Sequence, residues 1–429
     1  MPDMKCLRHA AAVLLTVALQ AQNTYIVDDT PYPGAQFTDL PAAVAFAASG
    51  DTLLVRNGNY SGFQVSGKAL TLRHEGSGSV TVGAITIELV PPGENFVLSH
   101  LRINAQSAGA PAALHVDSPA ATVTLLDCIC SGAPFARPGL VLAGGSIMQA
   151  HRSSFRAGDI SSAPWSWGSV GASIGAGAVL SATACDFLGG SASYNYAAAM
   201  SQGGPGIWSQ GIVDLREVQV TGGSAAVAGG NGSPGYGGAG VLVFSGALRI
   251  AGASSVVGGV GTGGPSGSII SPAVALNAGN ATVHPNVSLL PNGASSTSGA
   301  VQFDPRAMPR LTIDGTANWN AELDATQPVT IHVDHGAPGA PLFFAASLAP
   351  SHQLLGPVAV GDLFVDTANN GGAVTTGVLD SNGSFQVSLL PAATLAPLLG
   401  LPLYTQAASF DAGSLQLLTT NLVVRTFSL

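Results

Sequence analysis

Short runs rich in apolar residues lie near the N-terminus, and glycines punctuate this part of the chain. The runs occupy 25–27, 51–55, 63–65 and 70–72. Apolar and polar residues alternate in 63–65 and 70–72, and because successive side chains of a strand point to opposite faces, this alternation predicts short strands that each bury one face. The intervening segment 37–48 lacks the alternation, and Val44, Ala47 and Ala48 give it a modest apolar face at helical spacing.

A single short helix is therefore expected within 37–48. Asp39 can accept a backbone N–H as the N-cap residue, and Pro41 falls in the first turn, where its missing donor is harmless. Gly50 follows the segment and can end it. Since a strand comes next, we expect the helix to cover the open end of a stack of strands, whose edges would otherwise invite aggregation.

A short strand pattern recurs five times in the middle of the chain, at intervals of about 25 to about 36 residues. A drifting period is typical of a solenoid whose strands keep their register while its loops vary. The predicted inward column contains Cys130, Phe155, Phe187, Val220 and Val256. A second column, two residues earlier, contains Cys128, Ser153, Cys185, Val218 and Ser254. The residues between these columns, expected to point outward, are Ile129, Ser154, Asp186, Gln219 and Ser255.

The predicted helix and strands of 25–72 resemble the N-terminal cap and first coils of secreted right-handed parallel β-helix proteins, the pectin-lyase-like group. The resemblance implies an all-β chain that forms a right-handed parallel β-helix with an N-terminal capping helix. Enzymes of this kind cleave acidic polysaccharides in an outer groove, using clustered carboxylates with an arginine base or carboxylate pairs. No such motif is matched here residue by residue, so no catalytic residue can be carried over.

From about residue 301 the glycine runs become sparse, and separate strand-like runs alternate with turns such as 381–383. This spacing predicts an antiparallel β-sandwich-like domain over 326–429, after a β-helix that occupies 22–325. The end of the chain resembles a C-terminal module of exported bacterial proteins, especially those of planctomycetes. That resemblance implies a role in placement or stability.

Lys5, Arg8 and His9 precede the apolar run 10–19, and this order predicts a secretory signal peptide over 1–21. An apolar run this short cannot span a membrane. We therefore expect an exported protein, secreted or at the cell surface, with no membrane span after signal removal.

Loss of the signal peptide leaves three cysteines, Cys128, Cys130 and Cys185. In the predicted alignment Cys128 and Cys185 lie two coils apart, about 10 Å, which is too far for a disulfide. Cys128 and Cys130 are separated by about 7 Å with parallel side chains. We expect all three to be small buried core residues, outside any disulfide or metal site.

Charged residues make up only 9% of the chain, and its formal net charge of -9 at pH 7 forms no acidic or basic run. Phosphate binding needs clustered lysine and arginine, so nucleic acid is excluded as a partner. Glycine contributes 56 residues and is concentrated in 189–206, 222–240 and 258–267. We interpret these segments as turns that need positive φ.

The sequence offers only weak candidates for catalysis. Asp186 and Glu217 would lie on adjacent coils but two residues out of register, with backbones about 8 Å apart. That separation suits an inverting carboxylate pair. Outward carboxylates on an exported solenoid are, however, usually solubilising charges.

Aromatic residues gather in or beside the glycine-rich segments of consecutive coils. The candidate ligand-binding residues are Trp165, Trp167, Tyr194, Tyr196, Trp208 and Tyr236. If these segments leave one corner of the solenoid, the rings form a ladder suited to stacking on sugar rings. Aromatic residues in loops also simply pin backbone to the core.

Two functional classes remain open at this point. The first is an exported, non-catalytic β-helix protein, structural or polysaccharide-binding. The alternative is a polysaccharide lyase or glycoside hydrolase acting in an outer groove of the β-helix. We expect no cofactor and no metal, polysaccharide is the expected partner, and the oligomeric state stays open.

Overall fold

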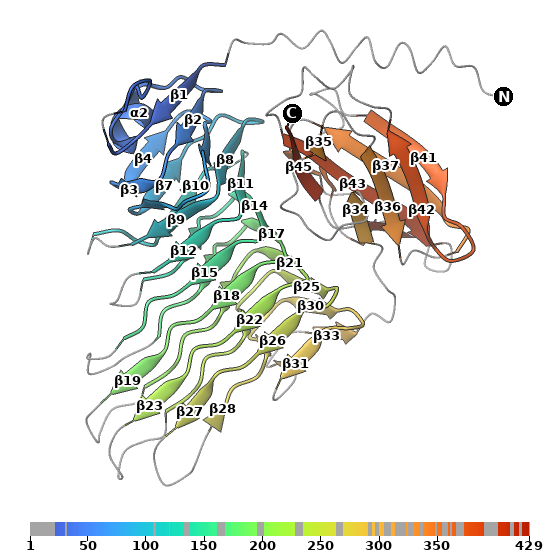
Figure 1. Ribbon diagram of the computed structural model, residues 1–429. Coiled ribbons are helices and arrows are strands. Elements are labelled where there is room, and N and C mark those ends of the chain that lie inside the picture. The colour runs from blue at the N-terminus through green and yellow to red at the C-terminus, as the bar shows by residue number, and fades with distance from the viewer. Residues whose placement is uncertain are drawn as a thin grey trace, which may run out of the picture. The chain divides into compact units, whose positions relative to one another are not determined.

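The computed structural model divides into two compact units, Ala21–Pro305 and Arg306–Leu429 (Figure 1). This division comes earlier than the limit near residue 325 expected from the sequence. The reason lies in strand β34 (Arg310–Ile313), which pairs with a strand of the second unit. The structure describes these residues: 22–30, 32–105, 109–119, 121–132, 137–160, 168–194, 201–227, 235–262, 269–290, 294–296, 300–303, 310–313, 323–324, 329–334, 338–347, 350–353, 359–360, 363–365, 373–389, 402–411, 416–419 and 423–428.

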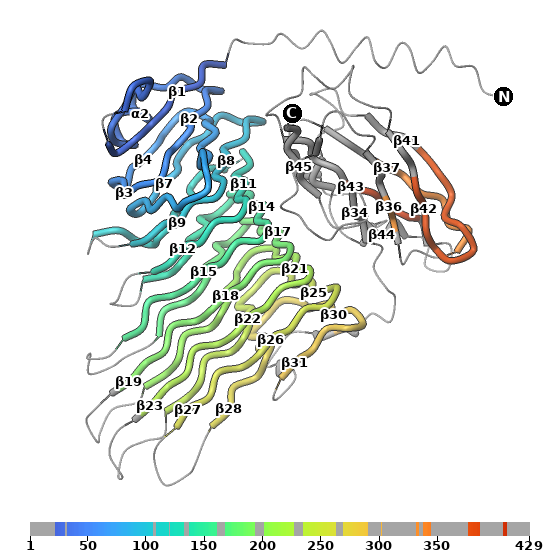
Figure 2. Tube along the Cα trace, in the orientation of Figure 1, coloured from blue at the N-terminus to red at the C-terminus, as the bar shows by residue number. Residues whose placement is uncertain are grey.

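The first unit is a right-handed parallel β-helix, as the sequence predicted, built from three long parallel sheets. Sheet A contains β1 (Thr24–Val27), β2 (Thr52–Val55), β5 (Thr71–His74), β8 (Asn95–Ser99), β11 (Thr122–Leu126), β14 (Ile147–His151), β17 (Val179–Thr183), β21 (Ile212–Arg216), β25 (Ala247–Ala251), β30 (Asn280–Val283) and β33 (Ala300–Phe303). From β2 to β32 (Ala294–Ser296), each coil adds one strand to each of the three long sheets in turn (Figure 2).

The other two sheets follow sheet A in each coil. Sheet B contains β3 (Gly58–Tyr60), β6 (Val80–Val82), β9 (Leu101–Asn104), β12 (Ile129–Ser131), β15 (Ser154–Arg156), β18 (Asp186–Leu188), β22 (Gln219–Thr221), β26 (Ser255–Val257) and β31 (Ser288–Leu290). Sheet C contains β4 (Phe63–Ser66), β7 (Ile85–Glu88), β10 (Leu114–Asp117), β13 (Leu140–Leu142), β16 (Ala172–Ile174), β20 (Ile207–Ser209), β24 (Val241–Val243), β29 (Val274–Leu276) and β32 (Ala294–Ser296).

The predicted inward column of sheet B is confirmed. Cys130, Phe155, Phe187, Val220 and Val256 pair in register from one coil to the next and are buried. The rings of Phe155 and Phe187 stack with centroids 5.0 Å apart and planes inclined by 15°. Stacked rings of this kind add specific attraction to the apolar burial, so this column is a continuous part of the core.

The three cysteines are free and buried, as predicted. Burial raises the pKa of both Cys128 and Cys185 to about 12, and it raises the pKa of Cys130 well above its usual value. A thiol, unlike a thiolate, is a weak nucleophile and a weak metal ligand. The cysteines therefore act as small core residues.

The cap at the N-terminal end matches the prediction in position and in its capping residue. Helix α2 (Leu40–Phe46) begins after Asp39, whose side chain accepts the Leu40 N–H at 2.9 Å. Its buried face differs slightly, because Leu40, Ala43 and Val44 are buried with Ala47 whereas Ala48 is exposed.

A lysine from the first coil binds the C-terminal end of this helix through hydrogen bonds. The Lys68 ammonium donates to the carbonyls of Val44 and Ala47, each at 2.8 Å, and to that of Ala45 at 3.2 Å. A cation is favourable at a helix C-terminus because the last carbonyls there lack intrahelical partners.

The glycine-rich segments form an arm that leaves the β-helix between sheets B and C. Strands β19 (Ala192–Tyr194), β23 (Ala225–Val227), β27 (Val260–Thr262) and β28 (Ile269–Ile270) form a small sheet in it. The chain leaves along these strands and returns beside them, and the two legs are joined by backbone hydrogen bonds. The Gly204 N–H donates to Gly190 O at 2.9 Å, and the Gly223 N–H donates to Gly204 O at 2.7 Å.

Positive φ does not explain the described glycines of this arm, so for these residues the sequence interpretation was wrong. None of the described glycines in 189–206, 222–240 or 258–262 has positive φ. A Cβ atom on Gly204 would instead collide with the carbonyl of Ser169, and one on Gly223 with the carbonyl of Gly190. Glycine is required because two backbone legs approach more closely than any side chain allows.

The second unit consists mainly of antiparallel strands. One sheet contains β34, β36 (Val329–Asp334) and β42 (Phe385–Leu389). The other contains β35 (Leu323–Asp324), β37 (Pro341–Ser347), β39 (Ala359–Val360), β41 (Ala373–Val378), β43 (Pro402–Asp411), β44 (Gln416–Thr419) and β45 (Val423–Ser428). A separate pair is formed by β38 (Pro350–Gln353) and β40 (Leu363–Val365). In the described part of the chain, no helix is long and apolar enough to cross a membrane.

Removing one ring from the inward column should destabilise the β-helix strongly. We expect Phe155→Ala to cost about 3–5 kcal/mol, because it leaves a cavity beneath Phe187. Urea unfolding followed by circular dichroism measures the shift in midpoint. The control is Leu188→Ala, since Leu188 is 43% exposed on the outside of β18, and equal midpoint shifts for the two variants would contradict this account of the core.

The three cysteines should resist alkylation until the β-helix unfolds. Because burial holds Cys128 and Cys185 as thiols with a pKa of about 12, iodoacetamide at pH 8 should leave them and Cys130 unmodified in native protein. The same treatment in guanidinium chloride should modify all three, as measured by peptide mass spectrometry. Rapid modification of any of them under native conditions would show that the column is open to solvent.

Candidate functional site

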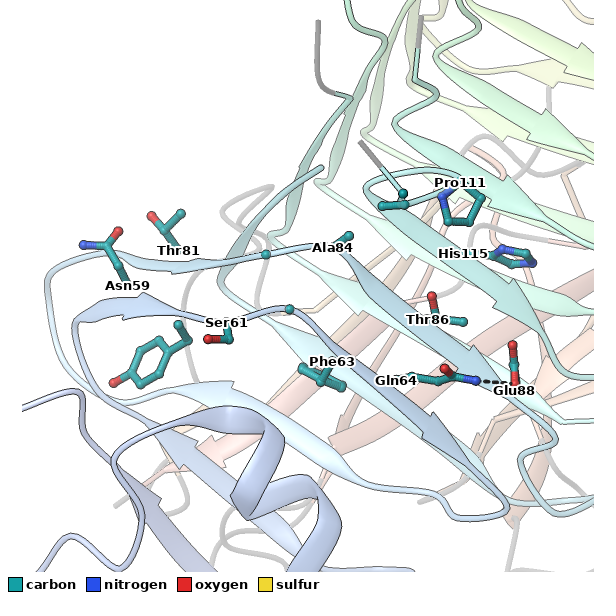
Figure 3. A pocket seen from close by; sticks show the side chains of 15 residues that line it. Asn59, Ser61, Phe63, Gln64, Thr81, Ala84, Thr86, Glu88, Pro111 and His115 are labelled. Carbon is teal, nitrogen blue, oxygen red and sulfur yellow. Dashed lines mark hydrogen bonds between the residues drawn. The ribbon is translucent and has the colours of Figure 1, made fainter. Parts of the chain in front are cut away.

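A pocket of about 960 Å³ lies at the corner between sheets B and C in the first three coils (Figure 3). The corner is tight because Gly62 and Gly83 lie against one another. A Cβ on Gly62 would collide with the backbone of Ala84, and one on Gly83 with the backbone of Gly62. These glycines let strands β3 and β6 turn directly into β4 and β7, and the turn leaves the hollow outside the corner.

Polar side chains from successive coils line the sheet C side of this pocket. Gln64, Thr86 and His115 occupy the same outward position of β4, β7 and β10, because these strands pair in register. Glu88 lies two residues beyond Thr86, and its carboxylate accepts a hydrogen bond from the Gln64 amide at 2.8 Å. Figure 3 shows the four side chains projecting from this sheet toward the same space. The column presents an amide, a hydroxyl and an imidazole at spacings of about 4.8 Å.

The other walls come from sheet B and from the connection that precedes β10. Asn59 and Thr81 project from β3 and β6, while Ala110 and Pro111 lie on the next coil. Among the described residues that line the pocket, Glu88 is the only carboxylate, and lysine and arginine do not occur. Uncharged hydrogen-bonding groups therefore dominate its surface.

Tyr60 stiffens the base of the pocket. Its side chain is buried, and its hydroxyl lies 2.9 Å from Arg56 O and accepts the Asp29 N–H at 3.2 Å. Burial raises the pKa of Tyr60 to about 12, so the phenol stays neutral. Because its hydroxyl is bonded to its own coil and to the preceding one, Tyr60 supports the pocket wall without itself offering a charge.

His115 offers a hydrogen-bonding atom that the rest of the described chain does not use. Its Nδ1 atom is buried and has no hydrogen-bond partner among the described residues. Because Nδ1 is shielded from solvent, a ligand in the pocket can meet only the exposed part of the half-buried imidazole. His115 therefore contributes the exposed part of its ring to the sheet C wall of the pocket.

The same outward column continues along sheet C and reaches an aromatic pair. Beyond His115 it passes through β13 and β16 to Trp208 on β20. Trp208 lies three coils from His115, about 14 Å along the axis. Its ring is half-buried and lies 6.2 Å, centroid to centroid, from that of Phe244, which is 47% exposed. One face thus carries a polar pocket and an apolar platform.

Two carboxylates lie side by side at the edge of this face. Glu88 and Asp117 are directly paired across β7 and β10, so their side chains point outward from adjacent coils. Asp117 is exposed and Glu88 is half-buried. The pair was missed in the sequence because its alignment depends on the register of two short strands, 85–88 and 114–117. Aligning those strands by their alternation would have placed both in one column.

The carboxylates predicted from the sequence are less well placed. Asp186 is exposed on β18 and pairs with Gln219, so Glu217 is two residues out of register with it, as expected. Glu217 is not on a strand. It occupies the bend between β21 and β22 with φ of 55°, and the two carboxylates therefore belong to different elements.

The aromatic candidates do not form one series among the described residues. Trp208 belongs to sheet C, whereas Tyr194 belongs to β19 of the arm. Tyr236 lies on the returning leg of the arm, where it bridges Gln202 and Ile269, and it is 39% exposed. Trp165, Trp167 and Tyr196 lie outside the described residues.

A ladder of charged residues follows the corner between sheets A and B. His100, Asp127, Arg152 and Glu217 occupy equivalent bends with positive φ. Arg152 forms an ion pair with Asp127, and His100 Nε2 lies 3.4 Å from the Asp127 carboxylate. His100, Asp127 and Arg152 contact one another at these bends, so these three have a structural role, whereas Ala184 occupies the bend between Arg152 and Glu217. The described residues contain no cluster of histidine, cysteine and carboxylates that could hold a metal.

A second ion cluster lies on sheet A. The Asp214 carboxylate is buried and lies 3.2 Å from both Arg216 and Arg249. Burial alone would raise the pKa of Asp214, but the two guanidinium charges outweigh it, and the pKa lies below its usual value. The carboxylate is thus held ionised between two partners, which leaves it unavailable as a proton donor.

Comparison with known proteins adds little to this geometry. No family model matches the chain, and no curated protein matches it. Among solved structures, the chain is similar to a mutant tailspike protein of E. coli bacteriophage HK620 in complex with a pentasaccharide, at 12% identity and a TM-score of 0.23. This alignment covers 89% of this chain and 88% of that chain. A second mutant of the same tailspike gives 11% identity, the same TM-score and the same coverage. TM-scores this low carry no argument, and the fold rests on the strand pairing described above.

Breaking the ion cluster of sheet A should destabilise the β-helix in a pH-dependent way. Because the pKa of Asp214 is lower in the folded than in the unfolded chain, its stabilisation is present above the unfolded value and is lost as pH falls through the folded value. We expect Asp214→Asn to cost about 3 kcal/mol at pH 7, since two arginines lose their counter-charge. The urea unfolding midpoints of wild type and Asp214→Asn should be measured at pH 7 and at pH 3. The difference between the two midpoints should be smaller at pH 3. A constant difference would contradict the assignment.

Proposed function

We propose that this chain is an exported, non-catalytic polysaccharide-binding protein that binds along the outer face of sheet C. The observation that carries the proposal is the register of that face, which aligns Gln64, Thr86 and His115 in a pocket and continues to Trp208. Sugar rings offer hydroxyl groups that pair with amides and imidazoles, and apolar faces that stack on aromatic rings. Export is supported by the signal-peptide pattern of 1–21.

The separation of the two parts of this face suits an extended chain better than a small molecule. The pocket and Trp208 are about 14 Å apart along the axis. A ligand that contacts both must span several coils in a direction parallel to the solenoid. A linear polysaccharide has the length and the repeated hydroxyl pattern that such a surface requires.

One observation favours the alternative, a glycoside hydrolase. Glu88 and Asp117 are paired in register on adjacent coils, and retaining glycosidases use two carboxyl groups about 5 Å apart. Against this, Glu88 is already held by the Gln64 amide, and neither carboxylate is enclosed as a general acid usually is. Binding without cleavage is therefore the function we favour, and the experiment below scores the two separately.

Purified mature protein should bind at least one polysaccharide in a broad panel without releasing new reducing ends. Trp208→Ala should weaken that binding roughly tenfold because it removes the stacking surface. His115→Ala should weaken it several-fold by removing one hydrogen-bonding group. Affinity electrophoresis measures retention, and a reducing-end assay measures cleavage.

The matched controls are outward residues of sheet B. Leu188→Ala and Gln219→Ala change exposed side chains on strands β18 and β22, so they should leave retention unchanged. Retention that is equally reduced in controls and sheet C variants would place the binding surface elsewhere. New reducing ends that disappear in Glu88→Gln would select the hydrolase.

A further inference from the structure

The outer face of sheet C is the one long face of the β-helix whose described strands carry no lysine or arginine. Its strands contain two carboxylates, Glu88 and Asp117, and no cation. The described strands of sheets A and B, by contrast, include Arg73, Arg102, Arg156, Arg216 and Arg249. The uneven distribution means that a ligand lying along sheet C meets only negative fixed charge from the strands beneath it.

The cations nearest to the pocket lie outside the strands of sheet C and do not cancel the negative charge of Glu88 and Asp117. Lys68 is engaged by three carbonyls at the end of helix α2. Arg102 is exposed and follows Thr81 in the outward column of sheet B, so it lies beside the sheet B wall of the pocket and outside the strands of sheet C that lead to Trp208. Arg137 lies in the turn before β13 and has interaction partners of its own.

We propose that the ligand of this face is an uncharged polysaccharide, and that Glu88 and Asp117 exclude polyanionic ones such as polyuronates. This inference rests on the proposed function of sheet C. An anionic chain long enough to reach from the pocket to Trp208 would bring its own carboxylates close to both residues. Like charges brought together at a binding surface oppose association, whereas hydroxyl groups on a neutral chain find the amide, hydroxyl and imidazole of the pocket.

The contacts of Glu88 and Asp117 indicate that the two carboxylates affect a ligand mainly through their negative charge and less through hydrogen bonds to it. Glu88 already accepts from Gln64 at 2.8 Å, so one of its oxygens is occupied. Asp117 is exposed at the end of β10. Replacing both by their amides keeps size and shape and removes two negative charges from this face.

The test compares wild type with the double variant Glu88→Gln/Asp117→Asn, in mature full-length protein. The probes are neutral polysaccharides (dextran, mixed-linkage β-glucan and galactomannan) and anionic ones (polygalacturonate and alginate). Wild type should bind a neutral polysaccharide and fail to bind the anionic ones at low salt. The double variant should gain roughly three- to tenfold for polygalacturonate relative to its own affinity for the neutral polysaccharide. Because exposed charges are screened by salt, this gain should shrink at about 0.5 M NaCl.

A second double variant controls for net charge. Glu75→Gln/Glu94→Gln also removes two carboxylates, but these lie beside sheet A, where Glu75 pairs with Arg56 and Glu94 accepts from Ser49. It should leave binding of polygalacturonate unchanged. An equal gain in both double variants would assign the effect to the whole molecule and overturn the inference.

The failures of the two proposals are distinguishable. Wild-type binding of polygalacturonate as tight as that of a neutral polysaccharide overturns the charge inference and leaves sheet C binding intact. Loss of neutral binding in Glu88→Gln/Asp117→Asn also overturns it, since the carboxylates would then be contacts. Absence of binding to every polysaccharide overturns the proposed function and the inference together.

Discussion

In-register stacking of parallel strands is the constraint on which the rest of this β-helix depends. Each coil lies about 4.8 Å from the next, so the backbone hydrogen bonds that hold the coils together also fix which side chains are neighbours. A residue at one inward position must therefore share space with the residues directly above and below it. The column of Cys130, Phe155, Phe187 and Val220 meets this condition by setting a small side chain before two stacked rings. Register in turn places the outward residues in columns, and every surface feature of the β-helix inherits that geometry.

The features that could be predicted from the sequence are those that follow from alternation within one strand. The inward column, the free cysteines and the Asp39 cap all depend on local pattern, and the structure confirms them. Features that depend on contacts between coils were not predictable in the same way. The collision that makes Gly204 necessary involves Ser169, a residue on another coil. The sheet C pocket was missed for the same reason, because Gln64 and His115 become neighbours of one hollow only when the corner and the register are known.

The glycine arm shows how backbone alone can extend a solenoid. Its two legs exchange hydrogen bonds in alternation, from Gly190 to Gly204 to Gly223, with no side chain between them. The cost of ordering glycine is high, because the residue loses more conformational freedom than any other. The close approach of the two legs offsets part of that entropic cost, because backbone N–H groups of one leg donate hydrogen bonds to carbonyls of the other. In its described part the arm is therefore held by backbone hydrogen bonds between its legs, beside the small buried side chains of Ala192 and Ala225.

The distribution of charge separates the faces that hold the β-helix together from the face that is free to recognise a ligand. Most cations of the first unit are committed to structural partners. Arg56 pairs with Asp28 and Glu75, Arg152 with Asp127, and Arg216 and Arg249 with Asp214, while Lys68 binds the end of the capping helix. Sheet C takes no part in these pairs, and its strands carry uncharged polar groups, one tryptophan and two carboxylates. A surface that needs no ion pairs for stability can vary its outward residues without loosening the coils, since the inward residues and the backbone ladder hold the register. We therefore expect ligand recognition on the outer face of sheet C, where the inward side chains and the backbone hydrogen bonds hold the strands in register without help from surface ion pairs.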